Sequence, residues 1–289
     1  MVVVSLFGGL GNQLFQYAVG RAVAFRHKTI LKLDVTAFEV YRLQAYSLTH
    51  FNIREEFAYV GPVARLLGHP TNRHLRRLRR YFPYFWLHSV NEQQQYKFDP
   101  GIFEKGRNVL LYGFWQSERY LRDISDLLHR ELTVRTAADR ENSAVAEAIR
   151  SVEAVSVHVR RADYVTDNLT LQKHGTCSTD YYRAAIGELT ANVRAPHFFV
   201  FSDDPGWAQA NLAFEDPVTF VTHNKADRNY EDLRLMTLCQ HHIIANSSFS
   251  WWGAWLGTNP KRIVIAPRRW LNDDTVDTSE LFPDNWRRI

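Results

Sequence analysis

Apolar residues recur along the chain in two alternating patterns, short runs of strand length and longer stretches with helical spacing. Residues 2–7 form an apolar run, a glycine-rich turn follows, and residues 12–26 carry apolar side chains at helical spacing before a second run at 30–34. This order predicts a βαβ unit whose glycine turn lies at the carboxyl end of the first strand. A run at 109–114 and a helical stretch at 118–132 complete a first lobe.

The second half of the chain alternates more regularly. Strands are predicted at 154–159, 198–202, 218–221, 242–245 and 262–266, and helices at 180–193, 205–212, 230–239 and 251–256. This alternation is typical of a parallel α/β sheet. With 289 residues, the chain lies near the size at which single cores split. We therefore predict an α/β protein with two Rossmann-like lobes, residues 1–149 and residues 150–289.

Composition adds little to this picture. The net charge of +4 suits an anionic ligand such as a nucleotide-sugar, and an ordinary basic surface explains it equally well. Cys177 and Cys239 are the only cysteines, and their spacing fits neither a disulfide framework nor a CxxC site, which favours reduced thiols. Because the start of the sequence has neither a basic region followed by a cleavage site nor a membrane-spanning run, we expect a cytoplasmic protein.

One basic and aromatic stretch, residues 69–88, has two interpretations. It contains five arginines followed by five aromatic residues: Arg73, Arg76, Arg77, Arg79, Arg80, Tyr81, Phe82, Tyr84, Phe85 and Trp86. Such a segment could lie at an anionic membrane surface and give the protein a peripheral membrane contact. The default interpretation is a solvated basic helix with an aromatic anchor into the fold.

The glycine turn at residues 8–13 places backbone amides and a helix N-terminus where an anion or a sugar hydroxyl could bind. A dinucleotide fingerprint would need a third glycine at position 14, where Leu14 stands, and no P-loop lysine follows. Leu14 therefore counts against a Rossmann oxidoreductase that would hold a ribose with Asp34. Taken alone, the turn is more often a packing feature than a site.

The stretch 158–164 is the strongest candidate site in the second lobe. The valines of the preceding strand share one side, so His158 and Arg160 share the other, and the double arginine falls at the carboxyl end, where ligands bind in parallel sheets. An arginine fork can hold two phosphate oxygens and neutralise a departing diphosphate without a metal ion. The alternative is a surface ion pair between Arg161 and Asp163.

Asp203 and Asp204 directly follow the predicted strand 198–202. Adjacent carboxylates at this place could bind a divalent metal, hydrogen-bond a guanine or ribose, or cap the next helix. Capping is the default for Asp204. No convincing third ligand lies nearby, which disfavours a metal site.

Ser247 and Ser248 follow the predicted strand 242–245 and begin a helix that carries three tryptophans. Hydroxyl groups and free amides at a helix start can bind phosphate. The tryptophans offer stacking faces or buried mass, and core packing is the default for two of them.

Five stretches together resemble glycosyltransferase family 11, the α-1,2-fucosyltransferases. They are residues 8–18, 111–117, 158–164, 201–204 and 246–256, and they span the chain in the order of the family. The resemblance implies a GT-B architecture, two lobes facing across a cleft, with the donor bound by residues 150–289 and the acceptor near residues 1–149. It implies inverting transfer of L-fucose from GDP-fucose to O2 of a terminal β-galactoside, forming an α-1,2 linkage.

The resemblance also implies roles for individual residues. Arg160 would hold the β-phosphate, and Asn12 would reach the transferring sugar from the other lobe. The remaining donor-binding residues would be His158, Arg161, Asp203, Asp204, Asp232, Ser247, Ser248 and Phe249, with His158 and Asp232 on the guanine. A positively charged Arg160 would replace a metal ion, so neither a metal nor another cofactor is expected.

Three points stay open. The catalytic base is unassigned, with Asp163, Asp167 and His174 as candidates. A fucosyltransferase of other regiospecificity and a non-catalytic sugar-nucleotide or glycan-binding module are the alternative functions. The expected partners are GDP-fucose and a galactose-terminated glycan, with no nucleic acid and no obligate protein partner.

Overall fold

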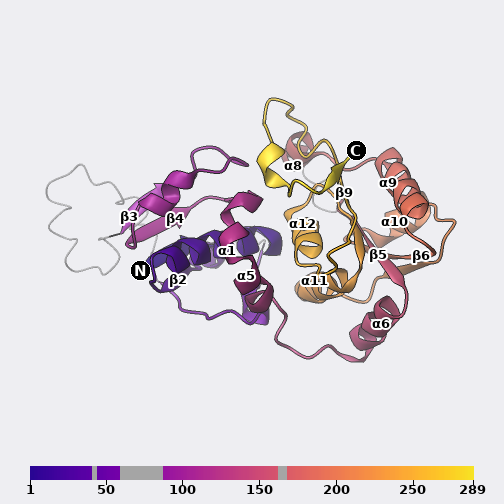
Figure 1. Cartoon of the computed structure of the whole chain (residues 1–289), viewed down its shortest axis with the longest axis horizontal. Coiled ribbons are helices and arrows are strands. Elements are labelled where there is room, and N and C mark those ends of the chain that lie inside the picture. The colour runs from indigo at the N-terminus through magenta and orange to yellow at the C-terminus, as the bar shows by residue number, and fades with distance from the viewer. Residues whose placement is uncertain (41–43, 59–86, 162–167) are drawn as a thin grey trace, which may run out of the picture. The chain divides into compact units, whose positions relative to one another are not determined.

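A computed structural model describes residues 1–40, 44–58, 87–161 and 168–289, and they form two compact α/β units (Figure 1). Unit 1 comprises Met1–Leu132 and Ser279–Phe282, and unit 2 comprises Thr133–Thr278 and Pro283–Ile289. The sequence predicted a boundary between residues 149 and 150, whereas the structure divides the chain after Leu132. The reason is that helix α6 (Arg140–Arg150) packs into the core of unit 2. Most of the basic and aromatic stretch, residues 69–86, lies outside the described residues.

Unit 1 contains a four-stranded parallel sheet in the order β2-β1-β4-β3. Its strands are β1 (Val2–Ser5), β2 (Leu31–Asp34), β3 (His88–Asn91) and β4 (Val109–Tyr112). Its helices are α1 (Leu10–Arg26), α2 (Ala37–Val40) and α5 (Ser125–Glu131), with 3-10 turns η1 (Leu48–His50), η3 (Pro100–Glu104), η4 (Glu118–Tyr120), η5 (Arg122–Ile124) and η7 (Ser279–Leu281). The predicted βαβ unit is confirmed, because α1 connects the parallel neighbours β1 and β2.

The prediction of one continuous helix at 118–132 is wrong, because η4, η5 and α5 share this stretch. Two tertiary contacts hold its first turns. The Ser117 hydroxyl accepts from the backbone N–H of Arg119 and donates to the carbonyl of Glu280, and the buried Tyr120 hydroxyl accepts from the backbone N–H of Asp99. These bonds favour the tighter 3-10 form over a straight α-helix.

Unit 2 contains a six-stranded parallel sheet in the order β10-β9-β8-β5-β6-β7. Its strands are β5 (Glu153–Val159), β6 (Pro196–Ser202), β7 (Val218–Val221), β8 (His241–Ile243), β9 (Val264–Ala266) and β10 (Arg287–Arg288). Its other helices are α8 (Asn168–His174), α9 (Thr179–Asn192), α10 (Pro205–Asn211), α11 (Asn229–Leu238), α12 (Ser248–Trp255) and the 3-10 turn η6 (Ala226–Arg228). The five predicted strands are confirmed, while β10, α6 and α8 were not predicted.

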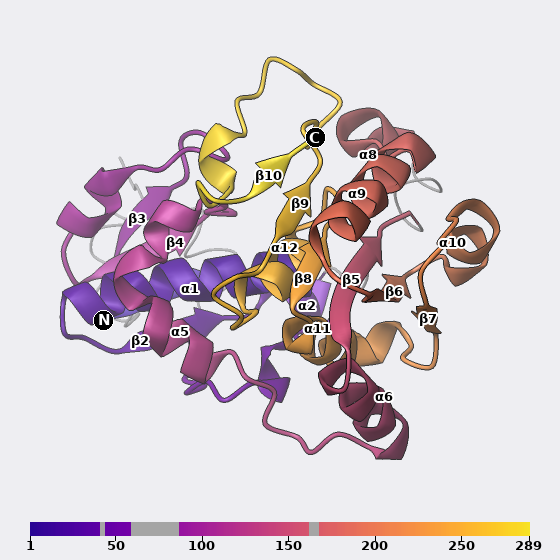
Figure 2. The same ribbon diagram turned by 45° about the vertical axis from the view of Figure 1, so that its right-hand side comes forward.

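Helices cover both faces of this sheet (Figure 2). The alternate side chains Val155, Val157 and Val159 of β5 pack in one core with residues of α9 and α10. On the opposite face, Phe199 and Phe201 of β6 pack in a second core with residues of α6 and α11. The predicted orientation of the β5 valines is therefore confirmed, and a sheet buried on both faces leaves its strand ends for binding.

Core packing also accounts for several residues that the sequence singled out. The three tryptophans of α12, Trp251, Trp252 and Trp255, are all buried. Cys177 and Cys239 are buried and unpaired, as expected for reduced thiols. Among the residues that the structure describes, no helix combines the length and the apolar character needed to cross a bilayer.

Candidate active site

An arginine turn follows β5 and is held by the first residue after β6. Arg160 Nη1 lies 2.9 Å from Oδ2 of Asp203. The backbone N–H of Arg161 donates to Oδ1 of the same carboxylate at 2.8 Å. Val159 and Ser202 are register partners, so the two turns leave the sheet side by side. Asp203 thus uses both oxygens to shape the arginine turn, and its predicted contact with the donor stays a prediction.

Arg161 is held from the next turn. Its guanidinium carbon lies 4.0 Å from the centroid of the Trp207 ring, and its Nε lies 3.6 Å from Oδ2 of Asp204. Asp204 is the N-cap of α10, since its side chain accepts from the backbone N–H of Trp207 at 3.1 Å. The capping role predicted for Asp204 is confirmed. Asp163, the alternative partner of Arg161, lies outside the described residues.

His158 is the last buried polar side chain of β5. Burial, followed by the nearby charge of Arg160, lowers the pKa of His158 to about 3, so the imidazole is neutral at physiological pH. Its ring lies 5.2 Å from the ring of Phe249, and its backbone carbonyl accepts from the Tyr182 hydroxyl at 3.1 Å. The contact with Phe249 places the first turn of α12 beside the end of β5.

The start of α12 is built as the sequence predicted. Ser247 is the N-cap, and its hydroxyl accepts from the backbone N–H of Phe249 at 3.3 Å. Ser248 and Phe249 are half-buried in the first turn, whereas Ser250 is buried and donates to the carbonyls of Ala245 and Ser247. A helix N-terminus beside two arginines is a place where an anion is stabilised.

The side chain of Asn246, just before the N-cap of α12, binds the main chain of two other segments of unit 2. Its Nδ2 donates to the carbonyls of His174 at 2.9 Å and of Gly175 and Trp270 at 3.3 Å. The base candidate His174 is the last residue of α8, and the hydrogen bond from Asn246 to its backbone carbonyl therefore places it near the start of α12. Asp163 and Asp167, the other base candidates, lie outside the described residues.

Asp232 lies in the first turn of α11, near the carboxyl end of β7. Its Oδ1 accepts from Nδ2 of Asn224 at 2.8 Å. The pKa of Asp232 is raised to about 7, mainly by burial; the hydrogen bond from Asn224 opposes this shift, and the nearby charge of Glu231 adds to it. This carboxylate thus changes its charge near neutral pH.

In unit 1, the glycine turn presents Asn12 in the first turn of α1. Asn12 Oδ1 accepts from Nε2 of Gln116 at 2.7 Å. Gly8 has a positive φ of 76°, and a Cβ there would lie 2.7 Å from Nδ2 of Asn12, so the turn needs glycine. Gln13 fastens the turn by donating to the carbonyls of Gly8 and Ala45. Asn12 and Arg160 belong to different units, and the predicted role of Asn12 toward the transferring sugar stays a prediction.

Glu92 holds the segment that carries Gln116. Its carboxylate accepts from the backbone N–H groups of Phe114 at 2.7 Å and of Trp115 at 2.9 Å. Burial raises the pKa of Glu92, and the two backbone hydrogen bonds oppose this shift. A Cβ on Gly113 would lie 2.4 Å from Cβ of Glu92, so the clamp also depends on glycine at this position.

Asp34, which a nicotinamide enzyme would use for a ribose, is engaged within unit 1. One oxygen accepts from the Ser5 hydroxyl at 2.9 Å, and the other accepts from the hydroxyl and the backbone N–H of Thr36. The side chain is fully buried. This geometry counts against the oxidoreductase alternative. Within the described ranges, no three His, Cys, Asp or Glu side chains gather as a metal-binding group would require.

Several residues of these sites were not predicted. Gln116 and Gly113 lie in a stretch that the sequence analysis quoted, and their roles emerge only from the contacts with Asn12 and Glu92. Asn224 follows β7, where a search of all strand ends would have found it. Asn142, its partner in α6, gave no sequence signal.

The structure is that of a two-unit α/β protein with two arginines at the carboxyl end of a central strand, and a solved structure shares this fold. The structure of Arabidopsis thaliana FUT1, determined in complex with GDP, superimposes with a TM-score of 0.53 at 11% identity, covering 98% of this chain and 74% of that one. The likeness supports the GT-B fold class, in which each unit carries a parallel sheet.

The family follows from the sequence comparisons. The model of glycosyl transferase family 11 matches residues 84–289. An alpha-1,2-colitosyltransferase of Escherichia coli is 36% identical over 100% of this chain and 99% of its own length. The O-antigen biosynthesis glycosyltransferase WbnK of Escherichia coli is 29% identical over 97% and 98%. Human galactoside alpha-(1,2)-fucosyltransferase 1 is 28% identical over 50% of this chain and 42% of its own length. The chain belongs to glycosyl transferase family 11 and is a glycosyltransferase of the fucosyltransferase class.

Proposed function

We propose that this enzyme transfers L-fucose from GDP-fucose to O2 of a terminal β-galactoside, with inversion at the anomeric carbon. Family membership supports the reaction class. The names of the related enzymes support an α-1,2 linkage, and that of the human relative supports a galactoside acceptor. In this proposal, unit 2 binds the donor and unit 1 contributes to acceptor binding.

The arginine turn is the observation that carries the proposal. Arg160 and Arg161 stand at the carboxyl end of β5, and the contact between His158 and Phe249 brings the start of α12 next to them. Guanidinium groups and helix amides are the groups that protein sites use for diphosphates. Such an arrangement of groups would stabilise the charge that develops on departing GDP.

In the proposed reaction, the acceptor hydroxyl oxygen attacks the anomeric carbon as the bond from that carbon to the β-phosphate oxygen breaks. The electron pair of the broken bond leaves with GDP, where Arg160 would stabilise it. The hydroxyl proton passes to a base or to solvent. The proposal needs no metal ion, because the positive charge of the arginine turn takes that role.

The base has three candidates, and variants would separate them. His174→Ala, Asp163→Asn and Asp167→Asn each remove one titratable group near or after the arginine turn. Loss of the base lowers kcat by roughly 100-fold to 10,000-fold and removes one arm of the pH profile. The variant with both effects identifies the base. If none shows them, the proton passes directly to solvent.

GDP-colitose is the second candidate donor and should be compared with GDP-fucose, because the 36% identical relative is named a colitosyltransferase. Colitose differs from fucose by the absence of the 3-hydroxyl group. A site that hydrogen-bonds this hydroxyl would reject the deoxy sugar strongly, whereas an apolar site would not. The ratio of kcat/KM for the GDP-linked forms of the two sugars therefore decides the donor.

The deciding experiment measures GDP release from GDP-fucose with a panel of β-galactosides and determines the product linkage by NMR. The expected product carries an α-1,2-linked fucose, and the rate is unchanged in EDTA. A different linkage identifies the alternative regiospecificity. If the protein binds the donor but turns over none of the acceptors, the non-catalytic alternative is favoured. A strict requirement for a divalent metal would contradict the metal-free mechanism.

A further inference from the structure

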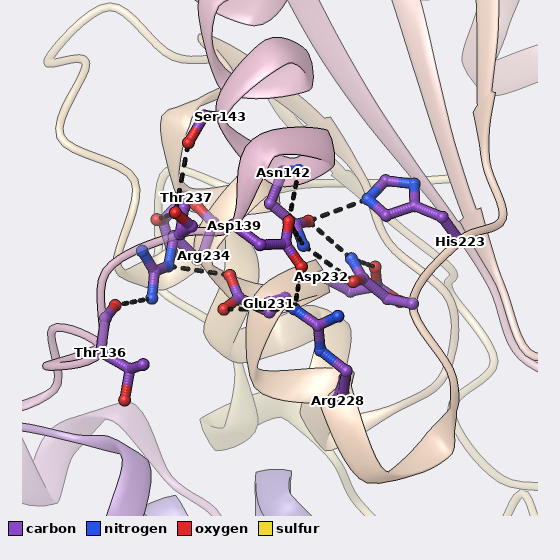
Figure 3. A network of polar contacts seen from close by, with 12 residues as sticks. Thr136, Asp139, Asn142, Ser143, His223, Arg228, Glu231, Asp232, Arg234 and Thr237 are labelled. Atoms are coloured by element: carbon purple, nitrogen blue, oxygen red, sulfur yellow. Dashed lines mark hydrogen bonds and ion pairs between the residues drawn. The ribbon is translucent and has the colours of Figure 1, made fainter.

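A network of polar side chains joins the amino ends of α6 and α11 to the turn after β7 (Figure 3). Within it, hydrogen bonds join Asp139, Asn142, His223, Asn224 and Asp232. None of the first four belongs to the arginine turn or to the start of α12. The network ends on Asp232, a carboxylate whose pKa is raised to about 7.

Two asparagine side chains form the centre of the network. Nδ2 of Asn224 donates to Oδ1 of Asn142 at 2.8 Å, and Nδ2 of Asn142 donates to Oδ1 of Asn224 at 3.0 Å. Each amide is therefore both donor and acceptor to the other. Asn142 is fully buried, so breaking this pair would leave amide groups without partners.

The neighbours of Asn142 determine which way both amides point. Its Nδ2 also donates to Oδ1 of Asp139 at 3.0 Å, and its Oδ1 accepts from Nε2 of His223 at 3.0 Å (Figure 3). Hydrogen bonds from the Asn142 backbone and from Arg228 lower the pKa of Asp139 to about 2, so this carboxylate only accepts at neutral pH. A reversed Asn142 amide would set its oxygen against that carboxylate. The observed orientation is therefore the stable one.

This orientation passes along the network to Asp232. Because Oδ1 of Asn142 faces Asn224, the Nδ2 of Asn224 must face it, and the second N–H of that nitrogen is aimed at Asp232. Both N–H groups of Asn224 are thus in use. The bond holds Oδ1 of Asp232, and among the described residues no other hydrogen bond is made to this carboxylate.

We propose that Asn224, oriented by Asn142, is the positioning residue that presents the Asp232 carboxylate to the guanine base of the nucleotide donor. The inference rests on the proposed function and on the guanine contact that the resemblance to the family implies for Asp232. Guanine fits because its N1–H and its 2-amino group are adjacent donors, which a carboxylate accepts together. Adenine offers an acceptor at N1, and uracil offers a single N–H between two carbonyls, so neither matches.

Charge adds a second role for Asn224. Its hydrogen bond favours the ionised form of Asp232 against burial and against Glu231. Without this bond the pKa of Asp232 would rise further, so a smaller fraction of the carboxyl group would be ionised at neutral pH and able to accept with both oxygens. The charged and titratable groups around Asp232 come from α11, α6, the turn after β7 and η6: Glu231, Arg234, Asp139, His223 and Arg228.

The test measures GDP binding to the full chain by calorimetry between pH 6 and pH 9, for the wild type and for Asn224→Ala. We expect the Kd at pH 7 to rise about ten-fold and the pH midpoint of binding to move upward. At saturating donor, kcat stays within about two-fold, because the arginine turn is untouched. A lower melting temperature with the same Kd and the same pH profile would mean that Asn224 is only structural, and would overturn the proposal.

Matched variants sharpen the result. Asn211→Ala removes an exposed asparagine whose side chain only bonds its own helix, and GDP binding should not change. Asn224→Gln keeps an amide but displaces it by one methylene, so it should also weaken GDP binding. It replaces the alanine variant as the test if that variant folds poorly. In an Asp232→Asn background, Asn224→Ala should add little, because the two residues act through one contact. Full additivity would count against the proposed relation.

Two further probes separate this inference from the proposed function. IDP lacks the 2-amino group of GDP, and the wild type should bind GDP more tightly than IDP or ADP. Asn224→Ala should reduce the preference for GDP over IDP. A wild type that prefers ADP would overturn both the GDP-sugar donor and this inference. A wild type that prefers GDP, with an unchanged preference in Asn224→Ala, would overturn only the positioning role.

Discussion

Asp203 binds the arginine turn at two points, through the guanidinium of Arg160 and through the backbone N–H of Arg161. One carboxylate thus sets the direction of a side chain and the path of the main chain that carries it. Contacts within the protein therefore fix the geometry of the turn. In the proposed reaction the diphosphate would meet a guanidinium that Asp203 holds, and preorganisation of this kind is what electrostatic catalysis requires.

Asp203→Asn should lower kcat by about ten-fold to a hundred-fold, since hydrogen bonds to charged groups contribute about 1.5–3 kcal/mol. The amide oxygen can still accept from Arg161, so the protein should fold normally. Steady-state kinetics with GDP-fucose would measure the effect. The control is Asp180→Asn, because Asp180 forms an exposed ion pair with Arg183 in α9, away from the arginine turn. Equal losses in both variants would contradict a special role for Asp203.

Arg160→Lys should lower kcat by roughly 100-fold, the range found when one charge-stabilising donor is removed. An ammonium group keeps the charge but cannot reproduce the planar fork. Arg183→Lys is the matched control, because Arg183 forms an exposed ion pair with Asp180 in α9. Near-normal turnover of the Arg160 variant would remove this residue from the centre of the mechanism.

Asp232→Asn should weaken donor binding and stabilise the protein at alkaline pH. The pKa of Asp232 rises from 3.8 to about 7 on folding, so the folded chain holds a proton that the unfolded chain has lost in this interval. The stability contributed at Asp232 therefore falls as the pH rises from about 4 to about 7. The variant should gain roughly 1–2 kcal/mol in unfolding free energy at pH 8 and little at pH 4, after allowance for partial solvent exposure. Urea titrations at the two pH values would measure the gain, and an equal change at both would exclude this cause.

Gly113→Ala and Gly187→Ala are the same substitution at two positions, and we expect them to change the stability of the protein in opposite directions. A methyl group at position 113 meets Cβ of Glu92, so unit 1 should lose about 1–3 kcal/mol in stability. Position 187 lies within α9, where a Cβ would meet nothing within 4 Å, and alanine should stabilise it by about 0.5–1 kcal/mol. Thermal unfolding followed by circular dichroism would show both signs. A neutral Gly113→Ala would mean that Glu92 moves aside at little cost.

The sequence by itself determined the alternation of strands and helices and therefore the parallel sheets. The valines of β5 and the aromatic residues of β6 pack on the two buried faces of the sheet. Such continuous apolar runs can be recognised from consecutive residues of the sequence. The same pattern placed Arg160 at a strand end. It did not predict α6 or α8, and it merged η4, η5 and α5 because the hydrogen bonds that separate them come from distant residues.

Only the tertiary structure decided which polar groups satisfy one another. Asn142 and Asn224 are 82 residues apart in sequence, and the backbone of Arg161 is 42 residues from Asp203. No local pattern encodes such pairs, because hydrogen bonds depend on distance and direction after packing has brought the elements together. The sequence alone thus predicted a candidate donor site at the end of β5, and the folded chain decided that Asp203 shapes the arginine turn and that Asn224 is aimed at Asp232.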